Sequence, residues 1–325
     1  MAKVLLVGCG ELGSRHLQAL AAVPLVSEID VVEPRPEARE LGQQRLAEAP
    51  GGIAGQVVHW HSALDHATHR GALCIVATRA EGRPTLIRQI VEELGYSTFL
   101  IEKVVAQSVA EYEALLKFSV DRGLRIWVNC KTRAYPVHAR IKQRLNPSEP
   151  MFFSVVGGNH GLVTNGIHMA DLFAFYDGAS RIELAGSHID PILHQTKRGM
   201  LDLSGTLQGY TEKGSRFTLS YAADHTASEQ LSINTRRYRC IVDHLQRWAV
   251  ETDADSGWAW RPIPYEGGLL VSDMTKQFAA DLLRLGRCEL PSLEESFVAH
   301  RFILEALKPH FSQLLQRELE SCPVT

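Results

Sequence analysis

The chain has 325 residues, of which 45% are hydrophobic and 22% are charged, and its formal net charge is −3 at pH 7. This length is sufficient for two domains that each bury a core of their own. The near-neutral charge argues against a nucleic-acid-binding surface, and the apolar runs are too short to span a bilayer. We therefore expect neither a nucleic acid nor a membrane as a partner.

The six cysteines are scattered along the chain without a Cys-x-x-Cys pair. This pattern is typical of reduced thiols in a cytoplasmic protein rather than of a disulfide framework, so we expect a cytoplasmic location. Four histidines fall within residues 59–69, but no cysteine accompanies them and their spacing does not place ligands on one face. We therefore predict no metal site.

The first 130 residues alternate strands with helices. Strands are expected at 3–7, 29–33, 57–60, 72–77, 98–102 and 124–129. Nearly continuous apolar strands between amphipathic helices predict α/β architecture, with a doubly wound parallel sheet covered on both faces. A sheet of this kind binds ligands at the carboxyl ends of its strands.

The pattern changes after residue 130. A helix is expected at 134–145, and the strand-like runs that follow lie at 151–157, 182–189, 201–210, 216–223, 229–235 and 236–245. The alternation of apolar and polar residues in these runs predicts an antiparallel sheet with one solvated face. Two helices, at 273–286 and 292–307, complete an α+β domain over residues 131–325, and they are candidates to pack against the first domain.

The first expected strand runs into a Gly-x-Gly-x-x-Gly motif, Gly8, Gly10, Glu11, Leu12 and Gly13, and a helix follows at once. The three glycines allow the tight turn, the close approach of a pyrophosphate and the packing of helix on strand. The amino end of the helix adds N–H groups and a positive dipole. We therefore predict a dinucleotide-binding domain over residues 1–130.

The choice between NAD and NADP depends on two residues after the second strand. Glu33 lies twenty positions after Gly13, where a carboxylate accepts hydrogen bonds from a ribose hydroxyl. Glu33 would repel the 2′-phosphate of NADP, whereas Arg35 would attract it. We favour NAD as the cofactor, with NADP as the alternative. The fourth strand leads to Ala77 and Thr78, which we expect beside the nicotinamide ribose.

The fifth expected strand ends in Glu102 and Lys103. A lysine at this edge of the sheet would project toward the nicotinamide. Desolvation beside a cationic ring would lower its pKa enough for proton exchange near neutral pH. A surface lysine is the alternative for this stretch taken alone.

A second polar stretch lies where a strand leads into a helix. It carries Asn159, His160, Asn165, His168 and Asp171 among apolar residues. His168 and Asp171 are three positions apart and are therefore neighbours on one helical face. A lone histidine at a helix start is more often structural, but this concentration of polar groups makes the junction a candidate site.

These stretches together resemble the Gfo/Idh/MocA oxidoreductase family, which includes glucose–fructose oxidoreductase and inositol dehydrogenase. The resemblance covers nearly the whole chain and rests on VLLVGCGELGSRH, IVATRAEGRP, LIEK, VNCKTRAYP, GIHMADLF and PSLEESFVAHRFILEAL. It implies a Rossmann domain followed by a domain with a large, mostly antiparallel sheet. The outer face of that sheet commonly forms an oligomer interface, so a homodimer or homotetramer is expected. The resemblance also implies NAD(P)-dependent chemistry on a sugar, cyclitol or similar polyol.

The resemblance assigns roles to three residues. Lys103 matches the lysine of the family's Glu-Lys-Pro signature, which contacts substrate and assists proton transfer, and Glu102 matches the neighbouring glutamate near the cofactor. His168 matches the histidine of the Asp-x-x-x-His pattern, a substrate ligand or acid–base partner. Two residues depart from these patterns, since Val104 replaces the proline and Thr164 replaces the aspartate.

Several arginines suggest an anionic substrate. Arg83 occupies the position where the family often has a histidine, and Arg79 lies nearby. With Arg133 they could bind a carboxylate or phosphate through guanidinium forks, although each alone is also consistent with a solvated surface position. Asn165 and Asp171 are further candidates for substrate contacts.

The leading hypothesis is a dehydrogenase that moves a hydride between the nicotinamide and a carbinol carbon of a sugar, nucleotide sugar or cyclitol derivative. Lys103 would be the base, and His168 would orient the hydroxyl or share its proton. One alternative is a catalytically inactive NAD(P)-binding sensor on the same fold, which Thr164 and Val104 favour. Another is a reductase of an unsaturated or linear tetrapyrrole substrate.

Overall fold

The computed structural model describes residues 1–49, 56–195, 199–224, 226–265 and 271–324. The chain forms two compact units. The first comprises Met1–Ala106, Ala110–Asn129 and Leu269–Leu293, and the second comprises Gln107–Val109, Cys130–Gly268 and Glu294–Thr325. The sequence places residues 269–293 in the second domain, whereas the structure groups them with the first unit.

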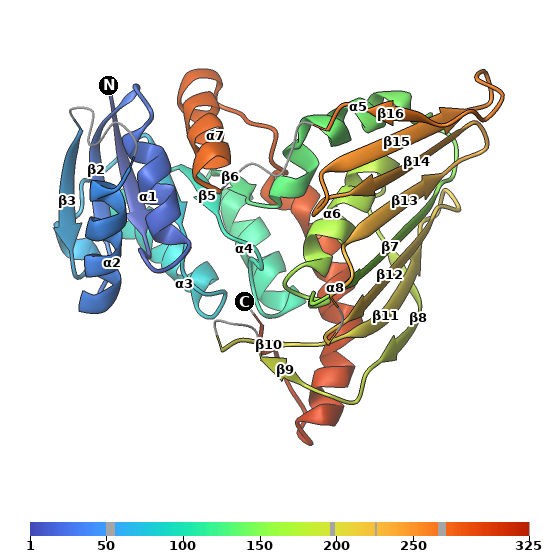
Figure 1. Ribbon diagram of the computed structural model, residues 1–325. Helices are drawn as coiled ribbons and strands as arrows, with labels where there is room; N and C mark the ends of the chain where they lie inside the picture. Colours follow the sequence, from blue (N-terminus) through green and yellow to red (C-terminus); the bar gives the residue numbers. More distant parts are fainter. Residues whose placement is uncertain (50–55, 196–198, 225, 266–270, 325) are drawn as a thin grey trace. The chain divides into compact units, whose positions relative to one another are not determined.

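The first unit contains a six-stranded parallel sheet in the order β3-β2-β1-β4-β5-β6 (Figure 1). The strands are β1 (Ala2–Val7), β2 (Val26–Val32), β3 (Val57–His61), β4 (Leu73–Val76), β5 (Thr98–Ile101) and β6 (Arg125–Val128). The order reverses between β1 and β4, and this switch point is where doubly wound sheets bind their ligands. The Rossmann-type topology expected from the sequence is confirmed.

The helices of the first unit are α1 (Gly13–Ala21), α2 (Pro36–Ala47), α3 (Arg83–Gln89), α4 (Val109–Asp121) and α7 (Val271–Leu285). A π-helical segment, Ile90–Leu94, extends α3. Helices cover the central strands of the sheet, so Leu5, Leu6 and Ile75 are almost fully buried. Helix α7 packs against α1 and buries Met274 and Phe278, which explains why it belongs to this unit.

The second unit contains an eight-stranded sheet in the order β16-β15-β14-β13-β7-β12-β11-β8. Its pairings are antiparallel except that β7 and β12 run parallel. The strands are β7 (Phe152–Gly158), β8 (Glu183–Ile189), β11 (Gly205–Tyr210), β12 (Arg216–Ala222), β13 (Gln230–Asn234), β14 (Tyr238–Asp243), β15 (Trp248–Asp253) and β16 (Arg261–Ile263). The large, mostly antiparallel sheet that we expected is thus confirmed.

Two details differ from the sequence expectation. The run at 201–210 is not one strand: β10 (Leu201–Asp202) pairs with β9 (His194–Gln195) in a separate ribbon, and β11 begins at Gly205. The strands β15 and β16 were not expected, because buried acidic residues interrupt the apolar pattern of β15.

Helices α5 (Pro136–Arg144), α6 (Gly166–Asp177) and α8 (Leu293–Leu314) belong to the second unit apart from the first residue of α8. Figure 1 shows α6 and α8 against the same face of the sheet. Phe217 of β12 meets Phe302 of α8 with ring centroids 5.6 Å apart, and α6 also contacts β12. The opposite face carries exposed apolar side chains, among them Phe152, Val156 and Tyr210. No helix among the described residues is long and apolar enough to cross a membrane.

Candidate active site

The glycine-rich loop turns the chain from β1 into α1. Gly8 has a φ of +87°, which a residue with a side chain rarely adopts, and a Cβ on Gly13 would lie 1.9 Å from the carbonyl oxygen of Gly8. The loop therefore depends on both glycines. The N-cap residue of α1, Leu12, makes no side-chain capping hydrogen bond. An uncapped helix start beside a glycine-rich loop fits a pyrophosphate.

Glu33 follows β2 and is held in place from two sides. Its Oε2 accepts a hydrogen bond from the Cys9 amide at 2.8 Å, and its Oε1 accepts one from the Arg35 amide at 3.1 Å. The carboxylate is only 2% exposed. Burial alone would raise the pKa of Glu33, but the hydrogen bonds from Arg35 and Cys9 outweigh it and lower the pKa. Glu33 is therefore an ionised hydrogen-bond acceptor beside the glycine loop.

The Arg35 guanidinium lies over the same loop. A Cβ added to Gly10 would be 3.3 Å from Nη2 of Arg35. The side chain of Arg35 remains 57% exposed although it pairs with Glu33. A cation is thus available next to the carboxylate that was expected to select NAD.

The structure brings Ala77 and Thr78 to the glycine loop. The Ala77 amide donates to the Val7 carbonyl at 2.8 Å, and a Cβ on Gly8 would lie 3.0 Å from the carbonyl carbon of Ala77 and 3.1 Å from Cγ2 of Thr78. The ends of β1 and β4 therefore meet at one place. Arg79, the next residue, is exposed.

Glu102 and Lys103 follow the end of β5 at the same edge of the sheet. The Glu102 amide donates to the Val76 carbonyl at 3.0 Å, which joins this segment to β4. Lys103 is half-buried, and the peptide bond between Lys103 and Val104 is cis. The strand itself ends at Ile101, one residue earlier than expected.

Glu102 is the centre of a buried polar network that the sequence did not reveal. Its Oε1 accepts a hydrogen bond from Asn129 and lies 2.9 Å from Nε2 of His16, whose Nδ1 is 2.9 Å from Oγ1 of Thr275. The Glu102 side chain is nearly enclosed. Burial alone would raise the pKa of Glu102, but the interactions with His16 and Asn129, together with the Lys103 charge, lower it. An ionised carboxylate therefore precedes Lys103 in the chain.

Arg83 requires a correction. We expected it to add a cationic donor for the substrate, but it is 1% exposed and donates to the backbone carbonyls of Thr78, Glu102 and Val104. Burial lowers the pKa of Arg83 to about 10, and the Glu102 charge opposes this. Arg83 thus ties the segment after β4 to the segment after β5.

The second unit contains the other group of candidate residues. Asn165 is the N-cap residue of α6, and His168 lies in the first turn, where its amide donates to the Asn165 carbonyl at 3.0 Å. Both side chains are half-buried. Thr164, which replaces the family aspartate, donates its hydroxyl hydrogen to the carboxylate of Asp202. Asp202 lies 38 positions further along the chain, so sequence spacing carried no signal for it.

Arg133 and Asp171 pair with each other inside the second unit. Nε and Nη2 of Arg133 each donate to a carboxylate oxygen of Asp171 at 2.8 Å. Asp171 is fully buried, and burial raises its pKa to about 6 although the Arg133 charge opposes this. Both side chains thus have an internal partner, whereas the sequence suggested contacts with substrate.

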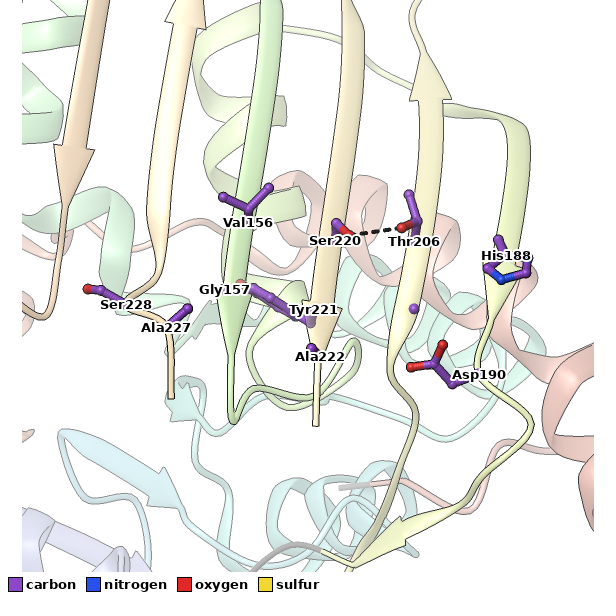
Figure 2. A pocket seen from close by; sticks show the side chains of 11 residues that line it. Val156, Gly157, His188, Asp190, Thr206, Ser220, Tyr221, Ala222, Ala227 and Ser228 are labelled. Atoms are coloured by element: carbon purple, nitrogen blue, oxygen red, sulfur yellow. Dashed lines mark hydrogen bonds between the residues drawn. The ribbon is translucent and has the colours of Figure 1, made fainter. Parts of the chain in front are cut away.

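A cavity of about 330 Å³ lies on the large sheet of the second unit. Figure 2 shows that it runs across β7, β12, β11 and β8, with Tyr221, His188 and Asp190 around it and a hydrogen bond of 2.9 Å between Thr206 and Ser220. None of the residues predicted for the site lines this cavity.

The described part of the chain contains no candidate metal site and no disulfide bond. No group of three or more histidine, cysteine, aspartate or glutamate side chains there could hold a metal ion. The six cysteines are free, and all but Cys288 are buried.

The two units together define a class of fold: a Rossmann-type unit joined to a unit built on a large, mostly antiparallel sheet. Solved structures share this fold. UDP-N-acetylglucosamine 3-dehydrogenase GnnA from Acidithiobacillus ferrooxidans aligns with a TM-score of 0.69 and 15% identity, over 98% of this chain and 96% of that chain. The 3-ketoreductase KijD10 from Actinomadura kijaniata, solved with NADP, aligns with a TM-score of 0.69 and 17% identity, over 93% and 95%.

A third structure, an oxidoreductase from Agrobacterium radiobacter in complex with NAD+, L-tartaric acid and magnesium, aligns with a TM-score of 0.72 and 12% identity, over 93% and 94%. At these identities the likeness shows a common fold, and it confirms the fold expected from the family resemblance. No protein-family model and no curated protein matches the sequence.

Proposed function

We propose that this protein is an NAD(P)-dependent oxidoreductase that transfers a hydride between the nicotinamide and a carbinol carbon of a sugar, nucleotide sugar or cyclitol derivative. The glycine loop with its uncapped helix start, next to the Glu33 carboxylate, is the observation that carries this proposal. The fold shared with GnnA and KijD10, which are named as a nucleotide-sugar dehydrogenase and a 3-ketoreductase, supports it.

We propose that the first unit holds the cofactor through the residues predicted from the sequence. The backbone from Gly8 to Gly13 would hold the pyrophosphate, and Glu33 would accept hydrogen bonds from the adenosine ribose. Ala77 and Thr78 would lie along the nicotinamide ribose. The bound cofactor supplies the hydride donor or acceptor. We favour NAD as the cofactor. NADP is the alternative, because the Arg35 guanidinium lies beside Glu33 and would attract the 2′-phosphate.

Lys103 and His168 are the residues that we propose to handle the proton of the reacting hydroxyl. Lys103 accepts the proton during oxidation, and His168 orients the hydroxyl or shares the proton. Asn165, beside His168 in the chain, is proposed to contact the substrate. Arg79, which is exposed, is the remaining candidate for an anionic group on the substrate. Arg133 and Asp171 support α6 through their buried pair.

The proposal is tested by assaying the purified protein with NAD and NADP against a panel of sugars and nucleotide sugars, following reduced-nicotinamide absorbance. Lys103→Met should abolish turnover and leave cofactor affinity nearly intact. Lys117→Met, at an exposed position of α4, is the matched control and should keep full activity. Unchanged turnover in Lys103→Met would remove Lys103 from the mechanism.

A second candidate function is a cofactor-binding sensor without catalysis. The absence of a carboxylate at Thr164 and of a proline at Val104 favours it. A protein that binds NAD or NADP tightly but converts no member of the substrate panel, in either direction, would support this function over the enzyme.

We also propose a homodimer or homotetramer, formed through the sheet face that carries Phe152, Val156 and Tyr210. These apolar side chains are exposed in the single chain. Sedimentation of the wild-type protein and of Val156→Asp tests this, since the substitution should shift the population to monomer. A cytoplasmic location fits the free cysteines, which stay reduced there.

A further inference from the structure

Asp202 is a buried carboxylate that faces the start of α6. It is 2% exposed, and it accepts hydrogen bonds from the amides of Val163 and Thr164 at 2.9 Å and of Leu203 at 2.8 Å. The Thr164 hydroxyl is a further donor. Because several donors converge on it, the carboxylate is fixed in orientation.

The loop before α6 is shaped to receive this carboxylate. A Cβ on Gly161 would lie 1.8 Å from Oδ2 of Asp202 and 2.1 Å from its Cγ. Only glycine leaves enough room at this position. The contact is therefore a specific fit between Gly161, Thr164 and Asp202 rather than an incidental approach of two loops.

Thr164 lies in the turn that leads into α6, and His168 lies in the first turn of that helix. The Asn165 amide donates to the Gly161 carbonyl at 3.0 Å and the Ile167 amide to the Val163 carbonyl at 3.3 Å, so the chain is wound helically before α6 formally begins. Residues four apart in such a segment are neighbours on one face. The hydroxyl bound to Asp202 is therefore one helical turn from His168.

The hydrogen bond determines what Thr164 can do. A threonine hydroxyl has one hydrogen to donate, and here that hydrogen is directed to Asp202. The hydroxyl oxygen of Thr164 can then only accept further hydrogen bonds. Because the hydroxyl donates to a carboxylate, its oxygen is a stronger acceptor. Thr164 can thus accept a hydrogen bond from the His168 ring or from a substrate hydroxyl, as a carboxylate at position 164 would.

We propose that Asp202, acting through the Thr164 hydroxyl, replaces the carboxylate that this chain lacks at position 164 and is a positioning residue for His168. The consequence for turnover rests on the proposed function, whereas the coupling between Asp202, Thr164 and His168 does not. Asp202 does not exchange the substrate proton itself, because the loop amides and the Thr164 hydroxyl occupy its oxygens.

The coupling is tested on the full-length protein without any substrate. The His168 ring is titrated by NMR in protein labelled on histidine, and its signal is assigned by its loss in His168→Gln. Thr164→Val and Asp202→Asn should each move the His168 titration midpoint to lower pH, by about half a unit, because a nearby acceptor or negative charge is removed. Thr164→Ser, which keeps the hydroxyl, should restore the wild-type midpoint.

Asp243→Asn is the matched control. Asp243 is another buried carboxylate of the second unit, and it accepts hydrogen bonds from the Ser228 hydroxyl and the Gln246 amide. This substitution should leave the His168 titration unchanged. The other titratable side chains near Asp202 are His194 of β9, adjacent in the ribbon, and Tyr221 of β12, whose pKa Asp202 influences. Tyr221 hydrogen-bonds to Glu229, and the His168 signal is distinguished from that of His194 by its loss in His168→Gln.

If turnover is found, Thr164→Val and Asp202→Asn should each lower kcat about 10-fold to 100-fold, and the double variant should be no worse than the worse single variant. Thr164→Ser should stay within about 3-fold of wild type. A wild-type protein without turnover would count against the proposed function and leave the titration test valid. A His168 midpoint that does not move in folded Thr164→Val would overturn this inference, even if Asp202→Asn fails to fold.

Discussion

The guanidinium of Arg35 donates to both carboxylate oxygens of Glu33, from Nε to Oε1 at 3.0 Å and from Nη2 to Oε2 at 3.3 Å. The residue expected to select NAD is thus paired with the residue expected to attract NADP. Since Glu33 also accepts from the Cys9 amide, the pair is joined to the glycine loop. If the proposed function holds, we expect cofactor choice to depend on the pair rather than on Glu33 alone.

We predict that Arg35→Ala increases the preference for NAD over NADP by about 10-fold, because it removes a cation and leaves the Glu33 charge uncompensated. Separate titrations of the protein with NADH and NADPH measure the two dissociation constants. Arg15→Ala is the control, since Arg15 is exposed on α1 and bonds to Gln18. An unchanged ratio of the two constants in Arg35→Ala would contradict the prediction.

We predict that Glu102→Gln preserves cofactor affinity and changes the pH dependence of turnover. Glu102 and Lys103 interact electrostatically, since the Lys103 charge contributes to the lowered pKa of Glu102. By reciprocity the carboxylate favours the charged amine, so its neutralisation should move the acidic limb of the kcat/KM profile to lower pH if Lys103 is the base. A pH profile of wild type and variant measures this. If the acidic limb lies at the same pH in the variant and the wild type, Glu102 does not influence the proton transfer and the prediction is wrong.

We predict that Arg133→Met destabilises the protein most at alkaline pH, by about 3–5 kcal/mol, because Asp171 is left as an unpaired buried charge. Burial already raises the pKa of Asp171 from 3.8 to about 6, and loss of Arg133 removes the opposing effect. A folded-state pKa above the unfolded one means that the folded chain binds more protons, so its stability falls as pH rises. The loss should therefore shrink as the pH is lowered from the raised pKa of the variant toward about 6, and it should stay constant below that pH.

Urea unfolding of wild type and Arg133→Met at several pH values measures this difference. Asp171→Asn in the Arg133→Met background should remove most of the pH dependence, since the amide cannot ionise. A destabilisation that is constant across the pH range would show that Arg133 acts through packing, for example through its contact with the Phe175 ring, and not through the Asp171 charge.

Much of the first unit could be read from local sequence. The glycine motif encodes its own turn because Gly8 needs a positive φ and Gly13 a close contact with Gly8, and both are properties of neighbouring positions. The spacing from the motif to Glu33 follows from one strand–helix–strand repeat. The central strands β1, β4 and β5 could be predicted because they are buried between helices and are mostly apolar.

The features that the sequence did not predict depend on contacts between residues that are far apart in the chain. Strand β15 was not predicted because Glu251 and Asp253 interrupt its apolar pattern. Their charges are compensated by Arg261 of β16, at 3.1 Å and 2.6 Å. Arg144 of α5 also pairs with Asp253, so the cations that let this strand carry acidic residues come from other segments, and no local sequence pattern reports that.

The sequence by itself determined the fold class, the glycine loop and the identity of Lys103 and His168 as candidates, since each follows from residue type and short spacing. Only the tertiary structure showed which side chains surround them. It placed His16 and Asn129 on Glu102 and Asp202 on Thr164, across 86, 27 and 38 positions of chain. A buried polar group must find a partner somewhere, but which residue provides it is decided by how the strands and helices pack.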